Sequence, residues 1–477
     1  MGDIDPFTSA VDLAAAVRAR EVSPLELADL YLERIERLDP QLNAFCHRAD
    51  DEVRAAAKVA SDAVVAADDP AGLPPFHGVP LPIKDLNDVA GWPTTHGSLG
   101  ASDAPAPSSD PVVERFVNAG FVLLGKTATP EFGTISYTES DALGITRSPW
   151  DTERTPGGSS GGAGAAVAAG LAPIAHGSDG GGSIRIPSSC NGLVGLKPTR
   201  GRISNAHVDL EGLSTSGVLA RTVADLAAGL DVLSVHDPGA WWSPPSAGGS
   251  LTGSLREAPP TGLRVAAMHG TPGDLVPVDP ACASAVDLAL LALSAAGHHP
   301  DTRLPEMPSP DELVSAFGVI WNAGSAGVPL ADPEAVEPLN RTLRAAARGV
   351  DSLAYVEAVI TTQRLSRRVV ESFVANFDLL VTPTMACLPP PVGTWRDGMD
   401  DDPMMGIFNC FPMGIFTSIF NVTGLPAISV PIHHDDATGL PVGVQIVAAP
   451  WREDLLVRIA AQLERALPWK DRRPPVH

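Results

Sequence analysis

The sequence predicts an α/β protein, a single α/β/α domain in which a twisted mixed β-sheet is covered by helices. Helical patterns alternate with short apolar runs, which is the order that such a layered fold requires. Residues 110–119 read as a helix and residues 120–125 as a buried strand, and the same pairing recurs at 163–170 and 171–175. No linker is long enough to separate independent domains, so we expect residues 1–477 to form one domain.

The first half of the chain begins with a well-marked surface helix. Ser23, Pro24 and Glu26 provide its N-cap, its first-turn proline and its capping-box glutamate. Residues 79–83 are a short apolar strand that carries Lys84 into the interior. Further on, residues 193–196 predict another strand and residues 218–232 another helix.

The second half continues the alternation. Strands are expected at residues 263–268, 378–384, 427–430 and 442–448. Helices are expected at residues 280–296 and 453–467, and residues 310–376 are mostly helical in pattern. The mixture of strands and helices persists to the end of the chain, in agreement with one layered fold.

Charge and hydropathy exclude several classes of function. The chain has 33 basic and 56 acidic residues, a formal charge of −23, which opposes binding to nucleic acid or to an anionic membrane. No apolar run approaches the roughly eighteen residues of a membrane-spanning helix. An enzyme that acts on a neutral or cationic small molecule fits this composition better.

The cysteines predict neither a disulfide framework nor a zinc site. They are odd in number, scattered and without Cys-x-x-Cys spacing: Cys46, Cys190, Cys282, Cys387 and Cys410. We therefore expect no metal and no cofactor, and a reducing cytoplasm as the compartment. The first residues lack the basic start and apolar stretch of a signal peptide, which agrees with that compartment.

Two glycine-rich clusters, at residues 155–162 and 177–187, are the most unusual feature of the sequence. Glycine lets a backbone approach another group closely, but it costs more conformational entropy on folding than any other residue. We interpret the clusters as presenting one serine hydroxyl each, Ser159 and Ser183. The second cluster would also offer a fan of backbone N–H groups, which suits an oxyanion.

Three other interpretations of the clusters are weaker. Residues 157–161 fit the Gly-x-Ser-x-Gly elbow of α/β-hydrolases, but that elbow follows a buried strand and here a loop precedes it. Residues 162–167 resemble a dinucleotide-binding loop only vaguely and also lack the preceding strand. A single cluster would read as a plain connector, whereas two clusters separated by one helix and one strand favour a site.

The clusters and their surroundings resemble the amidase signature family of serine hydrolases. The resemblance is carried by Gly-Gly-Ser-Ser-Gly-Gly at 157–162, Gly-Gly-Ser-Ile-Arg-Ile-Pro at 181–187 and Gly-Leu-Val-Gly-Leu-Lys-Pro-Thr at 192–199. Further segments around residues 82–86, 121–127, 420–429 and 441–447 look like family segments in family order. Within the family, the chain looks most similar to bacterial amidases of the nylon-oligomer (6-aminohexanoate cyclic dimer) hydrolase kind.

The resemblance implies a Ser-cisSer-Lys triad. Lys84 matches the family's catalytic lysine, Ser159 its bridging serine on a cis peptide bond, and Ser183 its nucleophile. A desolvated, neutral lysine can act as the base, because burial disfavours the ammonium form. Taken without the resemblance, Lys84 is better interpreted as the partner of a buried carboxylate such as Asp85 or Asp88.

The expected oxyanion hole consists of the N–H groups of Gly180, Gly181 and Gly182. Many family members carry a β-branched residue at the position of Gly180, so glycine there suggests more room beside the acyl pocket. Asp179 and Arg185 read as an ion pair that clamps the loop. No histidine suggests itself as a base, and His176 reads as a core histidine.

The resemblance also divides the chain by role. It implies a signature core at about 75–205 and a variable, substrate-selecting region at about 240–410. Trp321 falls in that region at a pocket-lining position, and residues 385–411 are expected to cover the pocket. The implied activity is hydrolysis, through an acyl-enzyme, of the C–N bond of a small, mostly apolar amide.

Two alternatives with the same triad stay open at this point. One is a urethanase that cleaves carbamates, and the other is the glutamine amidotransferase subunit of tRNA-dependent transamidation, which demands a partner protein. An inactive binding scaffold fits poorly, because all three triad residues are present. A homodimer is compatible with the sequence.

Overall fold

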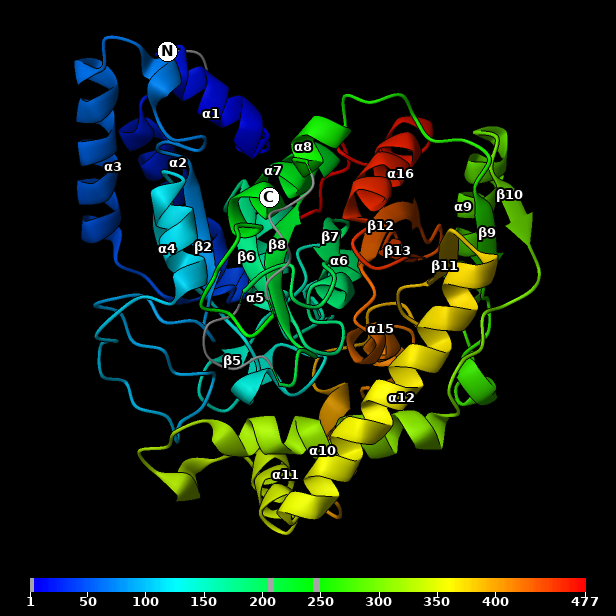
Figure 1. Cartoon of the computed structure of the whole chain (residues 1–477). Helices are drawn as coiled ribbons and strands as arrows, with labels where there is room; N and C mark the ends of the chain where they lie inside the picture. The colour runs from blue at the N-terminus through cyan, green and yellow to red at the C-terminus, as the bar shows by residue number, and fades with distance from the viewer. Residues whose placement is uncertain (1–3, 205–209, 243–248) are drawn as a thin grey trace.

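A mixed sheet of eight strands forms the centre of the protein in the computed structural model, in the order β10-β9-β11-β13-β12-β7-β8-β6 (Figure 1). The structure describes residues 4–204, 210–242 and 249–477; residues 1–3, 205–209 and 243–248 lie outside the description, the last group within the expected variable region. β9 pairs in parallel with β10 and β11, and the remaining neighbours pair antiparallel. The strands are β6 (Ile174–Asp179), β7 (Val194–Lys197), β8 (Thr215–Ala220), β9 (Arg264–Ala267), β10 (His299–Asp301), β11 (Leu379–Pro383), β12 (Ala427–His434) and β13 (Pro441–Ala448).

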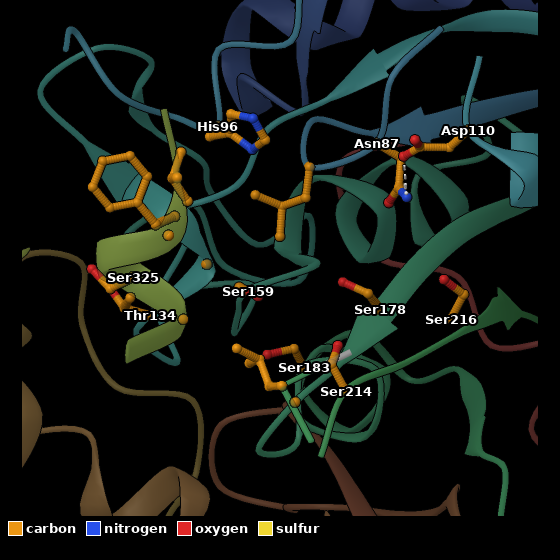
Figure 2. Close-up of a pocket in the computed structure, with 18 of the residues that line it drawn as sticks. Asn87, His96, Asp110, Thr134, Ser159, Ser178, Ser183, Ser214, Ser216 and Ser325 are labelled. Atoms are coloured by element: carbon orange, nitrogen blue, oxygen red, sulfur yellow. Dashed lines mark hydrogen bonds between the residues drawn. The ribbon is translucent and has the colours of Figure 1, made fainter. Parts of the chain in front are cut away.

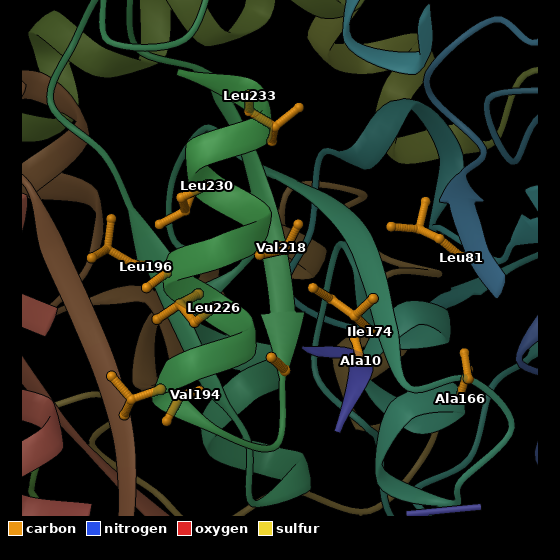
Figure 3. Close-up of a cluster of buried hydrophobic side chains, with 14 of the residues drawn as sticks. Ala10, Leu81, Ala166, Ile174, Val194, Leu196, Val218, Leu226, Leu230 and Leu233 are labelled. Carbon is orange, nitrogen blue, oxygen red and sulfur yellow. The ribbon is translucent and has the colours of Figure 1, made fainter. Parts of the chain in front are cut away.

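Each face of this sheet is buried under its own set of helices, and the alternation of side chains shows it. Val218 of β8 packs in the same apolar cluster as α7 (Val223–Leu233), whereas the next residue, Leu219, packs in the cluster of α5 (Gly161–Ala168). Successive side chains of a strand point to opposite faces, so α7 and α5 cover opposite sides. Figure 3 shows the α7 side, where Leu226 and Leu230 lie over Leu196 and Val218.

Helices α9 (Pro280–Ala295) and α16 (Glu453–Ala466) extend the α7 layer, and α6 (Arg185–Asn191) extends the α5 layer. A strand that is buried on both faces reads as a continuous apolar run, which explains why residues 427–432 of β12 and the whole of β13 contain one polar side chain each, Ser429 and Gln445. The sheet is therefore a rigid support for the loops that leave its strand ends.

A smaller sheet carries the lysine of interest. Its order is β1-β3-β2, with β1 (Phe45–His47) antiparallel and β2 (Pro80–Lys84) parallel to β3 (Val122–Thr127). Helices α1 (Ala10–Arg18), α2 (Pro24–Leu42), α3 (Asp50–Ala66) and α4 (Pro111–Asn118) lie on this side of the molecule (Figure 1). β2 lies beside β6 of the large sheet, so the end of β2 reaches the first residues of the second glycine cluster.

Three helices lie across the other end of the molecule: α10 (Pro310–Gly327), α11 (Pro338–Arg348) and α12 (Ser352–Asn376) (Figure 1). Ser309 and Glu312 form a capping box at the start of α10, so the sequence itself determines where this helix begins. α10 packs against both α11 and α12. One end of α10 reaches the site described below.

The predicted fold class is confirmed, and most predicted elements exist within a few residues. Two predictions were wrong. The strand expected at 171–175 is β6 and runs on to Asp179, and the helix expected to begin at residue 218 begins at Val223 because residues 215–220 form β8. Thr215–Ala220 contains two small polar residues and a glycine, which hid a strand buried on both faces.

Candidate active site

Lys84, the last residue of β2, is fully buried beside two serine hydroxyls. Its Nζ donates to Oγ of Ser159 at 2.7 Å and to Oγ of Ser178 at 3.1 Å. Burial lowers the pKa of Lys84 to about 7, and the distant charge of Asp179 opposes this only in part. A large fraction of the amine is therefore neutral near neutral pH, which a base requires.

The nearest carboxylate in sequence does not neutralise Lys84. Oδ1 of Asp85 lies 2.6 Å from Nζ of Lys126, and both side chains are buried. Asp85 also accepts hydrogen bonds from the backbone and the hydroxyl of Thr95. Among the described residues no carboxylate forms an ion pair with Lys84, so the alternative in which Lys84 pairs with Asp85 or Asp88 was wrong.

Ser159 and Ser183 come from the two glycine clusters and line one cavity. The peptide bond between Gly158 and Ser159 is cis, and Ser159 lies just before α5. Ser183 lies between β6 and α6 and is 8% exposed. Within the described chain no hydrogen bond joins the two serine side chains; catalytic hydrogen bonds are often long without substrate.

Asp179, at the end of β6, organises the second cluster. Its carboxylate accepts the N–H groups of Gly182 (2.8 Å) and Ile184 (3.2 Å) and pairs with the buried guanidinium of Arg185 (2.8 Å). Burial alone would raise the pKa of Asp179, but the charge and hydrogen bonds of Arg185, with a hydrogen bond from Asn421, hold it well below its usual range. Asp179 and Arg185 thus clamp the loop as expected.

This clamp changes the expected set of oxyanion donors. Because the N–H of Gly182 already donates to a carboxylate, Gly182 has to be removed from that set. Oγ1 of Thr417 donates to the carbonyl of Gly181 at 2.6 Å, so the Gly181–Gly182 peptide group is held at both its oxygen and its N–H. Among the described residues, the loop N–H groups without a hydrogen-bond partner are those of Gly180, Gly181 and Ser183.

The cavity around these residues has a volume of about 320 Å³. Figure 2 shows Ser159, Ser178 and Ser183 gathered in it, with Ser325 of α10 across from Ser178 and Ser216. The lining is mixed. Its apolar side chains are Leu86, Pro111, Val112, Phe132, Leu210, Trp321, Val328 and Pro329, and its polar ones are Asn87, Asp88, His96, Asp110, Thr134, Ser159, Ser178, Ser183, Ser214, Ser216 and Ser325. Residues of that composition suit a small molecule with a hydrocarbon part and a polar part.

Trp321 lines the cavity, as its position in the variable region led us to expect. Residues 385–411 do not: among the described residues they contribute nothing to the lining, so the expected cover of the pocket was wrong. That segment instead packs around the buried Trp395. The polar part of the site also includes Ser178, whose hydroxyl accepts a hydrogen bond from Nζ of Lys84.

His176 is a core residue, as expected. Its Nδ1 accepts the backbone N–H of Lys84 at 3.4 Å, and burial lowers its pKa to about 3, so it stays neutral. No group of three or more His, Cys, Asp and Glu side chains in the described ranges could hold a metal ion. In the same ranges no helix is both long and apolar enough to cross a membrane.

Comparison with known proteins agrees with the fold and the motifs. The family model described as Amidase matches residues 26–457. The 6-aminohexanoate-cyclic-dimer hydrolase of Paenarthrobacter ureafaciens is 38% identical, over 99% of this chain and 98% of that relative. A solved structure of 6-aminohexanoate cyclic dimer hydrolase superposes with a TM-score of 0.92 at 37% identity, covering 99% of this chain and 100% of the other. A bacterial aryl acylamidase superposes with a TM-score of 0.87 at 25% identity, over 98% of both chains.

Fold and motifs thus define the class as the amidases, C–N hydrolases that act on amides. More narrowly, the chain belongs to the amidase signature family, and its similarity to the cyclic-dimer hydrolases extends over nearly its full length.

Proposed function

We propose that this protein hydrolyses the C–N bond of a small, mostly apolar amide, with Ser183 as nucleophile, Ser159 as proton relay and Lys84 as base. The observation that carries the proposal is the 2.7 Å contact between Nζ of Lys84 and Oγ of Ser159, made by an amine that burial keeps substantially neutral. An amide needs this help, because its carbonyl is a poor electrophile and its amine a poor leaving group.

The proposed reaction has two halves. Neutral Lys84 takes the proton of Ser159 as Ser159 takes the proton of Ser183, and Oγ of Ser183 attacks the carbonyl carbon. The relay then runs in reverse to protonate the leaving nitrogen, the C–N bond breaks, and an acyl-enzyme remains on Ser183. Water, deprotonated through the same relay, hydrolyses the ester and restores the free serine.

The negative charge that develops on the carbonyl oxygen needs donors that are already in position. The N–H groups of Gly180, Gly181 and Ser183 are the proposed donors, and loss of one typically costs about 3–4 kcal/mol in the barrier. Support for this assignment comes from Asp179 and Thr417, whose hydrogen bonds fix the Gly181–Gly182 peptide group that lies between these donors.

The apolar part of the lining, which includes Trp321, supports a substrate with hydrocarbon next to its amide. The relatives named above act, by their names, on the cyclic dimer of 6-aminohexanoate and on aryl acylamides, and both classes belong in the first substrate panel. A carbamate offers the same carbonyl geometry, so the urethanase reading stays a prediction for the same panel. The glutamine amidotransferase reading likewise stays a prediction; turnover by the isolated chain without a partner would count against it.

The test combines turnover with detection of the intermediate. Anilides, fatty amides, nylon oligomers and aryl carbamates are assayed with the wild type and with Ser183→Ala, and intact-mass spectrometry follows labelling by a serine-reactive fluorophosphonate. We expect Ser183→Ala to lose at least about 10⁴-fold in kcat and to escape labelling. Full turnover or labelling in that variant would overturn the nucleophile assignment. Ser189→Ala is the matched control. Ser189 is buried outside the cavity, and its hydroxyl accepts the backbone N–H of Gly443 in β13.

A further inference from the structure

Two aromatic side chains of α10 lie over the second glycine cluster. Phe317 and Trp321 are one turn apart on the helix, and their rings stack with centroids 5.0 Å apart and planes 22° apart. Side chains at positions i and i+4 share a face of a helix, so the pair forms one continuous apolar plate.

The plate rests on glycine backbone with no side chain between. A Cβ built on Gly180 would lie 2.8 Å from Cζ3 and 3.3 Å from Cη2 of Trp321, and one on Gly181 would lie 3.4 Å from Cζ of Phe317. The first distance is shorter than any ordinary carbon contact. The indole therefore fills the space that a side chain at position 180 would occupy, and the extra room expected from glycine at this position is not free.

Space is the only obstacle to a side chain at position 180. Glycine is required on backbone grounds where φ is positive, as at Gly182 (φ +133°), but Gly180 does not have such a φ. Gly180 and Trp321 are thus sterically complementary: each determines what the other position can hold.

The contact lies at the reacting carbonyl. Gly180, Trp321 and Ser183 line the same cavity, and Gly180 and Gly181 are two of the three donors proposed for the carbonyl oxygen. An acyl chain that leaves such a carbonyl on the Trp321 side would begin beneath the indole ring. An acyl carbon that carries a branch would push against a ring already in contact with the backbone.

We propose that the Gly180–Trp321 contact selects acyl groups that are narrow next to the carbonyl, namely unbranched chains, and rejects groups branched at the carbon adjoining the carbonyl. This inference rests on the proposed function and names its substrate class. Apolar residues on the other walls, such as Leu86 and Val328, suit the hydrocarbon remainder of such a chain.

The test is a double-mutant cycle measured on a graded panel of p-nitroanilides: butyryl, hexanoyl, isobutyryl and pivaloyl. The variants are Gly180→Ala, Trp321→Leu and the double variant. Gly318→Ala is the matched control, because it adds a Cβ to the same helix in open space. All are compared by kcat/KM, with thermal unfolding measured for each.

The wild type is expected to prefer butyryl over isobutyryl by more than about tenfold, within the range that one methyl group produces in a tight pocket. Trp321→Leu is expected to lower this ratio at least about fivefold, and Gly180→Ala to lower kcat/KM for every substrate at least about tenfold. The double variant is expected to recover most of the Gly180→Ala loss, since removing the indole removes the clash. Gly318→Ala is expected to change neither the butyryl-to-isobutyryl ratio nor kcat/KM for any substrate.

Additive effects in the cycle, or an unchanged butyryl-to-isobutyryl ratio in Trp321→Leu, would overturn this inference. The proposed function would still hold as long as turnover depends on Ser183. If Gly180→Ala does not fold, the ratio in Trp321→Leu decides alone. Absence of Ser183-dependent turnover with every amide in both panels would overturn the proposed function itself, and this inference with it.

Discussion

Asp85 directly follows Lys84 in the chain, yet its carboxylate lies 2.6 Å from Nζ of Lys126 on the neighbouring strand β3. Adjacent residues of a strand point to opposite faces, so the backbone turns the Asp85 carboxylate away from the Lys84 amine. Lys126 then satisfies that carboxylate, together with Thr95. This arrangement leaves Lys84 buried without a counter-ion, the condition under which its pKa falls toward 7.

Removing Lys126 should therefore be costly. Lys126→Met leaves the Asp85 carboxylate buried and unpaired, and breaking a buried pair in this way destabilises a protein by about 3–5 kcal/mol. Urea unfolding followed by circular dichroism measures the loss. Lys58→Met is the matched control, because the Lys58–Asp62 pair is exposed and worth at most about 1 kcal/mol. An equal loss of stability in the two variants would show that the buried Lys126–Asp85 pair stabilises the protein no more than the exposed Lys58–Asp62 pair.

The activity should rise with pH through neutrality. Lys84 must be uncharged to accept a proton, and burial lowers its pKa to about 7, so kcat/KM is expected to rise up to about pH 7 and level off above it. Lys197 also has a pKa lowered to about 7, chiefly by burial, but it lies outside the cavity and donates to the carbonyl of Pro198. Lys197→Met should retain the ascending limb. If Lys197→Met lost the rise of kcat/KM with pH, Lys197 and not Lys84 would be the group whose deprotonation controls the activity.

The buried Lys84 should lower the stability of the fold at neutral pH, although the reaction requires it. The folded-state pKa of Lys84 is about 7 and the ordinary value is 10.5, so between these values the unfolded chain binds the extra proton and stability rises with pH. The contribution is about 1.4 kcal/mol per pH unit. Lys84→Met should thus be inactive yet more stable than the wild type at pH 7, and its advantage should shrink by pH 8.5. Urea unfolding at both values checks this; an advantage that is constant with pH would contradict it.

Asp179 is expected to matter for both folding and catalysis. Asp179→Asn keeps the side-chain shape but leaves the buried guanidinium of Arg185 without its counter-charge, at a cost of about 3–5 kcal/mol. It also weakens the hydrogen bond that orients Gly182, so kcat should fall more than KM changes. Asp378→Asn disrupts the partly exposed pair with Arg264 and serves as control. An unchanged kcat in Asp179→Asn would show that the Asp179–Arg185 pair is not needed to position the groups that catalyse the reaction.

The sequence predicted the fold class because strand and helix patterns are encoded locally. The contact between Lys84 and Ser159, which are 75 positions apart, was implied by the resemblance to the family. The residues alone could not predict contacts that depend on the conformation of a loop or that join distant segments. The engagement of the Gly182 N–H by Asp179 depends on how the loop folds back on β6, and the contact of Trp321 with Gly180 joins residues more than a hundred positions apart. The sequence analysis singled out the glycine at position 180. Whether the space beside it is empty or filled by another side chain depends on where α10 lies, and in the structure Trp321 fills it.

The docking of α11 on the cavity wall should weaken as pH rises from acid to neutral. The carboxylate of Glu131 accepts the backbone N–H of Glu337 (3.0 Å) and the amide of Asn340 (2.9 Å), while Thr134, which lines the cavity, donates to Asn340 at 2.8 Å. Burial, with the nearby charge of Glu131, raises the pKa of Glu337 to about 7, from an ordinary 4.5. Between these values the folded chain holds the extra proton, so stability falls as pH rises.

Glu337→Gln should remove this dependence, because the amide keeps the shape of the protonated acid and cannot ionise. The wild type is expected to lose stability relative to the variant between pH 5 and pH 7, and urea unfolding at the two values measures the difference. Glu334→Gln is the control, since Glu334 is exposed on the same connection. A difference between wild type and Glu337→Gln that does not grow with pH would mean that Glu337 is ionised throughout, and that the start of α11 tolerates two neighbouring carboxylates.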